Sequence, residues 1–194
     1  MRLMPIERPK SLLLRLFSRV VRRQFGKDLT PYQVIFARIP RALPSQFGIY
    51  WGLTGKYDLE PGLVFLLQNH TAALNGCAFC VDIGRATATY QGISLEKVDA
   101  VHAWRSSPLF TERERAALAY VEEATRTRHV DDATFDALRK HFDDTQIVAI
   151  TWLNAVENYF NLLNGPLGIG SDGLCAIAER RTRRPAAAPA VNAA

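Results

Sequence analysis

Apolar residues recur at helical spacing through most of the chain, and no useful stretch alternates as a β-strand would. Residues 11–25 set Leu13, Phe17 and Val20 against a row of arginines, which is the pattern of an amphipathic helix. Gly26 follows at the position where helices commonly end in a left-handed turn. The pattern predicts an all-α protein.

Helix-start and helix-stop residues divide the rest of the chain. Thr111 followed by Glu114 is a capping box, and proline, glycine and aspartate bound the other segments. The predicted helices cover residues 30–40, 45–55, 61–74, 77–90, 94–104, 111–126, 131–141 and 143–163. We therefore expect a basic helical arm (1–29), a helical domain (30–178) and a disordered tail rich in Arg, Ala and Pro (179–194).

Positive charge is concentrated at the two ends of this 194-residue chain, whose formal net charge is +5. A row of arginines on the arm could bind nucleic acid or an anionic membrane. Exposed aromatics do not interleave with it, so a solvated or subunit-docking face is favoured and no nucleic-acid partner is expected. Residues 61–81 lack charged side chains but include Gln68 and Asn75, which excludes a membrane span. Without a convincing signal peptide, we expect a cytoplasmic protein.

The candidate chemistry lies in the pair Cys77-Ala-Phe-Cys80, at a predicted helix start capped by Asn75 or Gly76. Free N–H groups and the helix dipole at such a start favour a thiolate. A spacing of three residues places both sulfurs on one face, close enough to form a disulfide. One thiolate can then attack an oxidant while the other resolves the product. The alternative is a pair of buried packing cysteines.

Metal binding is disfavoured by the rest of the cysteine and histidine pattern. Tetrahedral zinc needs four ligands, whereas Cys175 stands alone and no second Cys or His pair occurs. Cys175 is interpreted as a packing residue. We expect neither a metal nor another cofactor.

The run 74–83 (Leu-Asn-Gly-Cys-Ala-Phe-Cys-Val-Asp-Ile) resembles alkylhydroperoxidase D-like (AhpD-like) proteins of the carboxymuconolactone decarboxylase superfamily. Segments 110–118 and 157–161, with Gly168-Ile169, extend the resemblance to residues 59–169. The resemblance implies an all-α AhpD-like domain, trimers or hexamers, and thiol peroxidase activity supported by a thiol reductant protein. Cys80 would attack the peroxide and Cys77 would resolve it. The apolar helices at 61–74 and 145–163 also predict a homo-oligomer.

The usual proton relay of these hydroperoxidases is missing from the sequence. Gly84 stands where they carry a histidine, and Phe65 stands where they carry a glutamate. His70 is a candidate replacement in the preceding helix, although a hydrogen-bonded core or interface histidine is the competing interpretation. Asp82 is expected to point to solvent.

Together these features favour a thiol-dependent oxidoreductase of the antioxidant type, which reduces a hydroperoxide or small electrophile through Cys77 and Cys80. One alternative is a relay-deficient oligomer that senses redox state or binds a small molecule. The other is a carboxymuconolactone decarboxylase-like enzyme.

Overall fold

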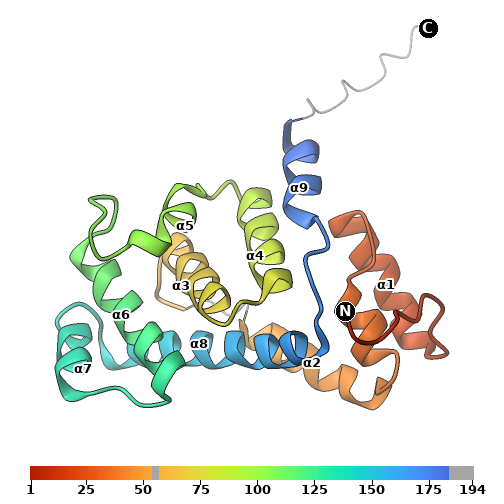
Figure 1. The fold of residues 1–194 in the computed structure, drawn as a ribbon, viewed down its shortest axis with the longest axis horizontal. Helices are drawn as coiled ribbons and strands as arrows, with labels where there is room; N and C mark the ends of the chain where they lie inside the picture. The colour runs from red at the N-terminus through yellow and green to blue at the C-terminus, as the bar shows by residue number, and fades with distance from the viewer. Residues whose placement is uncertain (54–56, 184–194) are drawn as a thin grey trace, which may run out of the picture.

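The computed structural model describes residues 1–53 and 57–183, and every regular element within them is helical (Figure 1). The expected all-α fold is confirmed. The α-helices are α1 (Leu12–Phe25), α2 (Leu43–Leu53), α3 (Pro61–Leu74), α4 (Ala78–Tyr90), α5 (Glu96–Asp99), α6 (Glu112–Thr127), α7 (Asp132–Arg139), α8 (Asp144–Asn164) and α9 (Leu174–Arg183). Shorter turns are η1 (Tyr32–Phe36), η2 (Pro40–Ala42), η3 (Val101–Ala103) and η4 (Gly165–Leu167).

Local caps explain why several boundaries match the sequence pattern. The Thr111–Glu114 capping box forms at the start of α6, and a second box forms between Asp143 and Gln146 at the start of α8. Gly26 takes a φ of 85° at the end of α1, the left-handed conformation that glycine adopts without a Cβ penalty.

Several predicted helices differ in the structure. The helix expected at 45–55 begins at Leu43, and residues 54–55 lie outside the described residues. Residues 30–40 contain the π-helical turn η1, closed by a bond from the Ala37 N–H to the Tyr32 carbonyl, rather than one continuous α-helix. Residues 94–104 are divided between α5 and η3. Helix α9 was not predicted, and it makes 179–183 helical where a disordered tail was expected to begin. The remainder of that expected tail, 184–194, lies outside the described residues.

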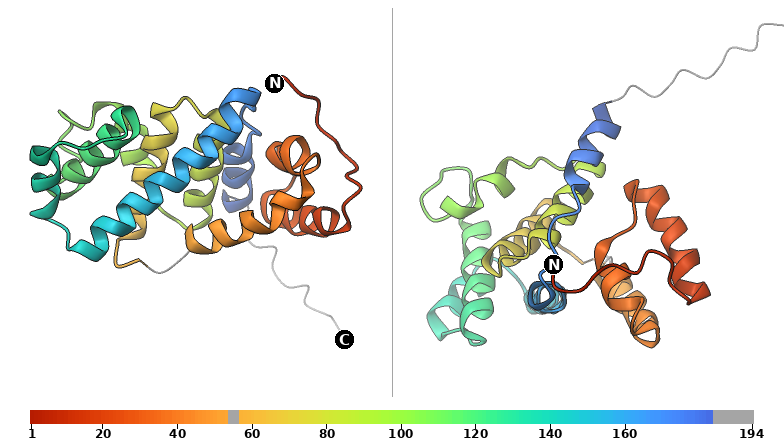
Figure 2. Two further views of the ribbon diagram at one scale, coloured as in Figure 1. Left: turned by 90° about the horizontal axis from the view of Figure 1, so that it is seen from below. Right: turned by 45° about the vertical axis from the view of Figure 1, so that its right-hand side comes forward.

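The hairpin of α3 and α4 stands on α8, with α6 and α7 toward one side of the molecule and α1 and α2 toward the other (Figures 1 and 2). Helix α2 meets α8 where Gly52 faces Trp152. Apolar faces of α3, α6 and α8 meet in one core that includes Leu66, Leu118 and Leu153. A second core joins α4 and α9 to the N-terminal segment and contains both Cys77 and Cys80.

The N-terminal segment packs against the helical domain. Leu14 and Val21 of α1 are buried in the second core. The Arg181 side chain of α9 donates to the backbone carbonyl of Gln24 at 2.9 Å. The N-terminal segment therefore forms part of the surroundings of the cysteine pair. Within the described residues, no helix is both long and apolar enough to cross a membrane.

Candidate functional site

The cysteine pair begins helix α4. Cys77 itself is the N-cap, not Asn75 or Gly76 as expected, and its sulfur accepts a bond from the Cys80 N–H at 3.3 Å. Gly76 makes the tight turn from α3 with a φ of 65°. The two cysteines are joined by a disulfide with their Cα atoms 5.3 Å apart, so the predicted pairing on one helical turn is present in the structure.

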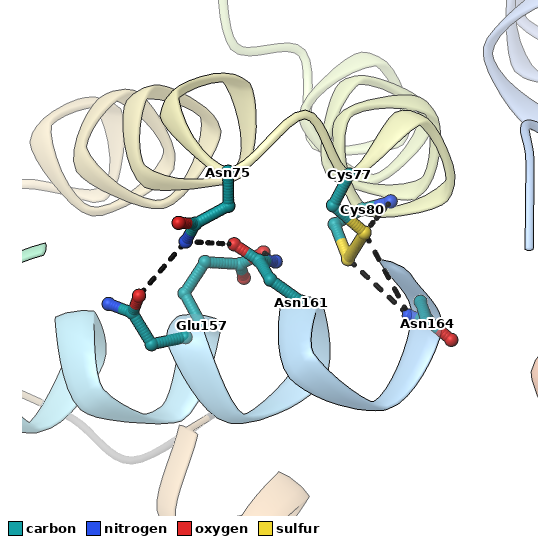
Figure 3. Close-up of a disulfide and its surroundings, with 7 residues drawn as sticks. Asn75, Cys77, Cys80, Glu157, Asn161 and Asn164 are labelled. Atoms are coloured by element: carbon teal, nitrogen blue, oxygen red, sulfur yellow. Dashed lines mark hydrogen bonds between the residues drawn. A yellow bond between two sulfur atoms is a disulfide. The ribbon is translucent and has the colours of Figure 1, made fainter. Parts of the chain in front are cut away.

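Helix α8 presents a row of polar side chains to the pair. Glu157, Asn161 and Asn164 point from α8 toward the α3–α4 turn (Figure 3). The Asn164 amide lies 3.5 Å from the Cys80 sulfur and 3.9 Å from the Cys77 sulfur. Asn161 accepts from the Asn75 amide at 2.8 Å and donates to Glu157 Oε1 at 2.7 Å. A chain of amides thus joins the exposed Asn75, in the turn before the cysteines, to the buried carboxyl group of Glu157.

Glu157 is only 8% exposed. Burial raises the pKa of its carboxyl group from 4.5 to about 7, and the hydrogen bond from Asn161 opposes this shift. A carboxyl group with such a pKa can both donate and accept a proton near neutral pH, as general acid–base chemistry requires.

A cavity of about 790 Å³ lies beside this row. Cys80, Glu157 and Asn164 contribute to its wall, together with aromatic and aliphatic side chains of α1, η1, α3 and α4. Because Cys80 and the titratable Glu157 line the same cavity, a ligand there can meet both residues.

The other cysteine lines a different hollow. Cys77, Asp82, Arg85 and Cys175 border a space of about 470 Å³ that shares no lining residue with the first among those described. Asp82 is buried there, which corrects the expectation that it points to solvent. Its carboxylate accepts from the N–H groups of Leu174 and Cys175, both at 2.9 Å, at the start of α9.

The two positions of the missing relay also lie at the cavity. Phe65 and Gly84 line it, and the space beside Gly84 is filled by the Asn69 amide of α3. A Cβ at Gly84 would come within 2.8 Å of Asn69 Nδ2. This amide therefore occupies the position into which a side chain at residue 84 would extend.

His70 is not placed with the cysteines. Its Nε2 lies 3.2 Å from Glu122 Oε2, and its ring packs edge-on against Trp104. Burial lowers the pKa of His70, although the Glu122 carboxylate opposes that shift. Among the residues described, His70 is not part of either wall around the disulfide. Its surroundings are those of a hydrogen-bonded core histidine.

Sequence reasoning missed Glu157 as a site residue and used it only as part of a resemblance. The pattern that points to it is the spacing on α8. Asn154, Glu157, Asn161 and Asn164 recur every three or four residues among apolar neighbours and are all buried. Such a polar stripe on the inward face of a helix indicates a buried network.

Comparisons with known proteins place this site in a family. The model of the carboxymuconolactone decarboxylase family matches residues 42–123. YnjA of Escherichia coli K12, an uncharacterized protein, is 36% identical over 174 residues, which span 88% of this chain and 94% of YnjA. The chain belongs to the carboxymuconolactone decarboxylase family. The residues of this chain that match the family model include α3, α4 and most of α6. They do not include α1, η1 or α8.

Solved structures support the same fold. A protein of unknown function from Agrobacterium tumefaciens, whose description relates it to the antioxidant defence protein AhpD, is 29% identical with a TM-score of 0.65. It covers 71% of this chain and 96% of its own. The debrominase Bmp8, as a cysteine-to-alanine variant in complex with 2,3,4-tribromopyrrole, has a TM-score of 0.77 at 18% identity, covering 93% of this chain and 97% of its own. The latter likeness is one of fold.

Proposed function

We propose that this family member is a thiol-dependent oxidoreductase that reduces organic hydroperoxides. The observation that carries the proposal is that Cys80 and Glu157 line one cavity while Cys77 is bonded to Cys80 and borders a separate hollow. Substrate can then meet Cys80 from one side while a thiol reductant reaches Cys77 from the other.

The proposed cycle starts from the reduced pair. The Cys80 thiolate attacks the terminal oxygen of the hydroperoxide, the O–O bond breaks, and Cys80 becomes a sulfenic acid. The leaving alkoxide takes a proton from the Glu157 carboxyl group and departs as an alcohol. Cys77 then attacks the sulfenic sulfur, which forms the disulfide and releases water. An external dithiol supplies two electrons and two protons to restore both thiols. The Cys80 thiol then passes its proton to the Glu157 carboxylate, which regenerates the thiolate and the protonated acid.

In this proposal Glu157 transfers the proton that the absent relay residues would otherwise transfer. Neither Phe65 nor Gly84 can transfer a proton, whereas the Glu157 carboxyl group is at the same cavity and titrates near neutral pH. The Asn164 amide beside both sulfurs is placed to donate to a thiolate.

The test separates the roles of the two cysteines. Reduced protein treated with one equivalent of tert-butyl hydroperoxide should lose two hydrogens by mass spectrometry and regain them with dithiothreitol. Cys77→Ser should instead accumulate a sulfenic acid that dimedone traps at Cys80, and Cys80→Ser should yield no adduct. A dimedone adduct at residue 77 of Cys80→Ser, formed as fast as the one at Cys80, would overturn the assignment.

The second candidate is a redox-sensing oligomer, and burial of the pair favours it. Cys77 and Cys80 are 2% and 5% exposed, which limits access of a reductant. Stoichiometric oxidation without steady-state consumption of hydroperoxide, under a thioredoxin or dithiothreitol supply, would support sensing over catalysis.

A further inference from the structure

Two separate parts of the chain form the walls of the cavity beside Cys80. One wall comes from α3, α4 and α8 and includes Phe65, Ile83 and Phe160. The facing wall comes from the N-terminal segment and includes Phe17 and Tyr32, which precede the residues that match the family model. A volume of about 790 Å³ is in the range of pockets that enclose drug-sized molecules. Such a space is far larger than a four-carbon hydroperoxide needs.

The described residues that line the cavity include no Lys, Arg or His. Glu157 contributes the carboxyl group there, and burial holds it mostly protonated below neutral pH. An anionic ligand would lose its hydration without gaining a counter-ion, which is strongly unfavourable. The wall therefore selects for an uncharged ligand.

Three residues of the wall each carry a buried amide oxygen that has no hydrogen-bond partner among the described residues. Gln46 Oε1, Asn69 Oδ1 and Asn164 Oδ1 have no hydrogen-bond partner in the described part of the chain, and their residues are 4%, 3% and 3% exposed. The amide nitrogen of Asn69 donates to the Phe65 carbonyl at 2.9 Å, which fixes its oxygen as the unsatisfied group. Each oxygen is itself shielded from the cavity space. Buried acceptors are normally satisfied, so an amide side chain that turns its oxygen toward the cavity would gain a partner from a hydroxyl or hydroperoxyl donor.

We propose that the cavity binds an uncharged organic hydroperoxide with a large apolar body, such as an esterified fatty-acid hydroperoxide. The reduction of this ligand rests on the proposed function, whereas its binding does not. The hydroperoxyl group lies at Cys80, where the Asn164 amide turns its oxygen to accept the hydroperoxyl hydrogen. The apolar body extends along the aromatic wall toward Phe17 and Tyr32. The alcohol product keeps one donor and the same apolar body, so it binds the same cavity.

The first test compares three substrates under a dithiothreitol supply, each below its micelle concentration. They are tert-butyl hydroperoxide, 13-hydroperoxyoctadecadienoic acid and the methyl ester of that acid. We expect the kcat/KM of the ester to exceed that of each of the others by about tenfold or more, since several buried methylenes and one avoided charge both favour it. Equal values for the ester and tert-butyl hydroperoxide, or a preference for the acid, would overturn the proposal.

A matched pair of variants locates the effect in the cavity. Thr87 and Thr89 are both half-buried on α4, and each hydroxyl donates to the carbonyl four residues earlier. Thr87 lines the cavity and Thr89 does not. Thr87→Trp should lower kcat/KM for the ester by about tenfold, with a much smaller effect on tert-butyl hydroperoxide, because it shortens the space for the apolar body. Thr89→Trp, with equal helicity by circular dichroism, should preserve the ratio of the two rates.

Binding of the unreactive alcohol separates this inference from the proposed function. Methyl 13-hydroxyoctadecadienoate should bind by calorimetry about tenfold more tightly than the free hydroxy acid, and Thr87→Trp should weaken it. If the ester alcohol binds in this way but no hydroperoxide is reduced, the proposed ligand class stands and the peroxidase proposal fails. If small hydroperoxides are reduced but the ester alcohol does not bind, the ligand class fails and the peroxidase proposal stands.

Discussion

A buried carboxyl group at Glu157 makes both the stability and the proposed chemistry depend on pH. Its pKa is raised by burial, from 4.5 to about 7 in the folded protein. Between these values the folded state holds a proton that the unfolded state has lost. The associated stability is fully present below pH 4.5, falls as pH rises, and is lost above about pH 7.

Glu157→Gln should remove this dependence, because glutamine keeps an oxygen for the Asn161 amide and carries no charge. Relative to the parent, the variant should gain about 3 kcal/mol of stability between pH 4.5 and pH 8. Urea unfolding of both reduced proteins at the two pH values measures the difference. The same variant should lose roughly 10²-fold or more in hydroperoxide reduction, as expected for a lost acid–base group. A stability difference that is constant with pH would contradict a raised Glu157 pKa.

Glycine is favoured at position 84 of α4 by a steric contact with a neighbouring side chain and not by its backbone conformation. Alanine normally stabilises a helix interior by about 1 kcal/mol over glycine, but here a Cβ would meet the buried Asn69 amide at 2.8 to 3.2 Å. Gly84→Ala should therefore lower the free energy of unfolding by about 1–2 kcal/mol. In an Asn69→Ala background the same change should raise it.

A double-mutant cycle by urea unfolding measures this coupling, expected to be about 2 kcal/mol. Additive effects would mean that Asn69 does not limit the residue at position 84. The contact also explains why a histidine at residue 84 cannot be added to this protein alone: the Asn69 amide must first be shortened.

At the scale of the helices, local sequence accounts for some boundaries and not for others. The starts of α6 and α8 were predictable because each cap and its partner lie three residues apart, at Thr111–Glu114 and Asp143–Gln146. Helix α9 was not predictable in this way. The carboxylate that accepts its first N–H groups is Asp82, 92 residues away from Leu174. The cap exists only after the chain has folded.

The same difference between local and distant contacts explains which site residues the sequence predicted and which it missed. Cys77 and Cys80 were found because their spacing is itself the pattern. Glu157 was missed, since its raised pKa comes from burial by segments distant in sequence. His70 was named because it is a titratable residue near the pair in sequence, and the fold turns it toward Glu122 instead.

The junction between α4 and α9 rests on Asp82. Its carboxylate accepts from the Ser171 hydroxyl and from the N–H groups of Asp172, Leu174 and Cys175 at 2.9–3.0 Å. Asp82→Asn should cost about 2–3 kcal/mol, because the amide turns a donor toward other donors and the negative charge at the α9 start is lost.

Hydrogen exchange locates the effect of Asp82→Asn. Amides of residues 172–183 should exchange faster in the variant, whereas those of α6 should change little. Asp99→Asn is the control, since Asp99 forms an exposed ion pair with Arg85 of the same helix α4, and such pairs contribute little. Unchanged exchange over α9 would show that Asp82 is not its cap.

At the scale of the whole molecule, the fold buries one of the two apolar helices that predict an oligomer and leaves the other partly uncovered. Leu63, Leu66 and Leu67 of α3 are inside the first core. On α8, Val148, Trp152 and Leu162 are 68%, 41% and 67% exposed. Their spacing places them within about 40° of a common line along the helix. An exposed apolar stripe of this kind is typical of an interface.

We expect α8 to bind α8 or another face of a second copy, so that light scattering at micromolar concentration gives a multiple of the 21.7 kDa chain mass. Leu162→Glu should dissociate the assembly, because a charge buried in an apolar contact is strongly unfavourable. Leu12→Glu is the matched control, since Leu12 on α1 is also 67% exposed but does not belong to the stripe. A single-chain mass for the parent protein would refute the oligomer, whereas dissociation by Leu12→Glu alone would place the interface on the N-terminal segment.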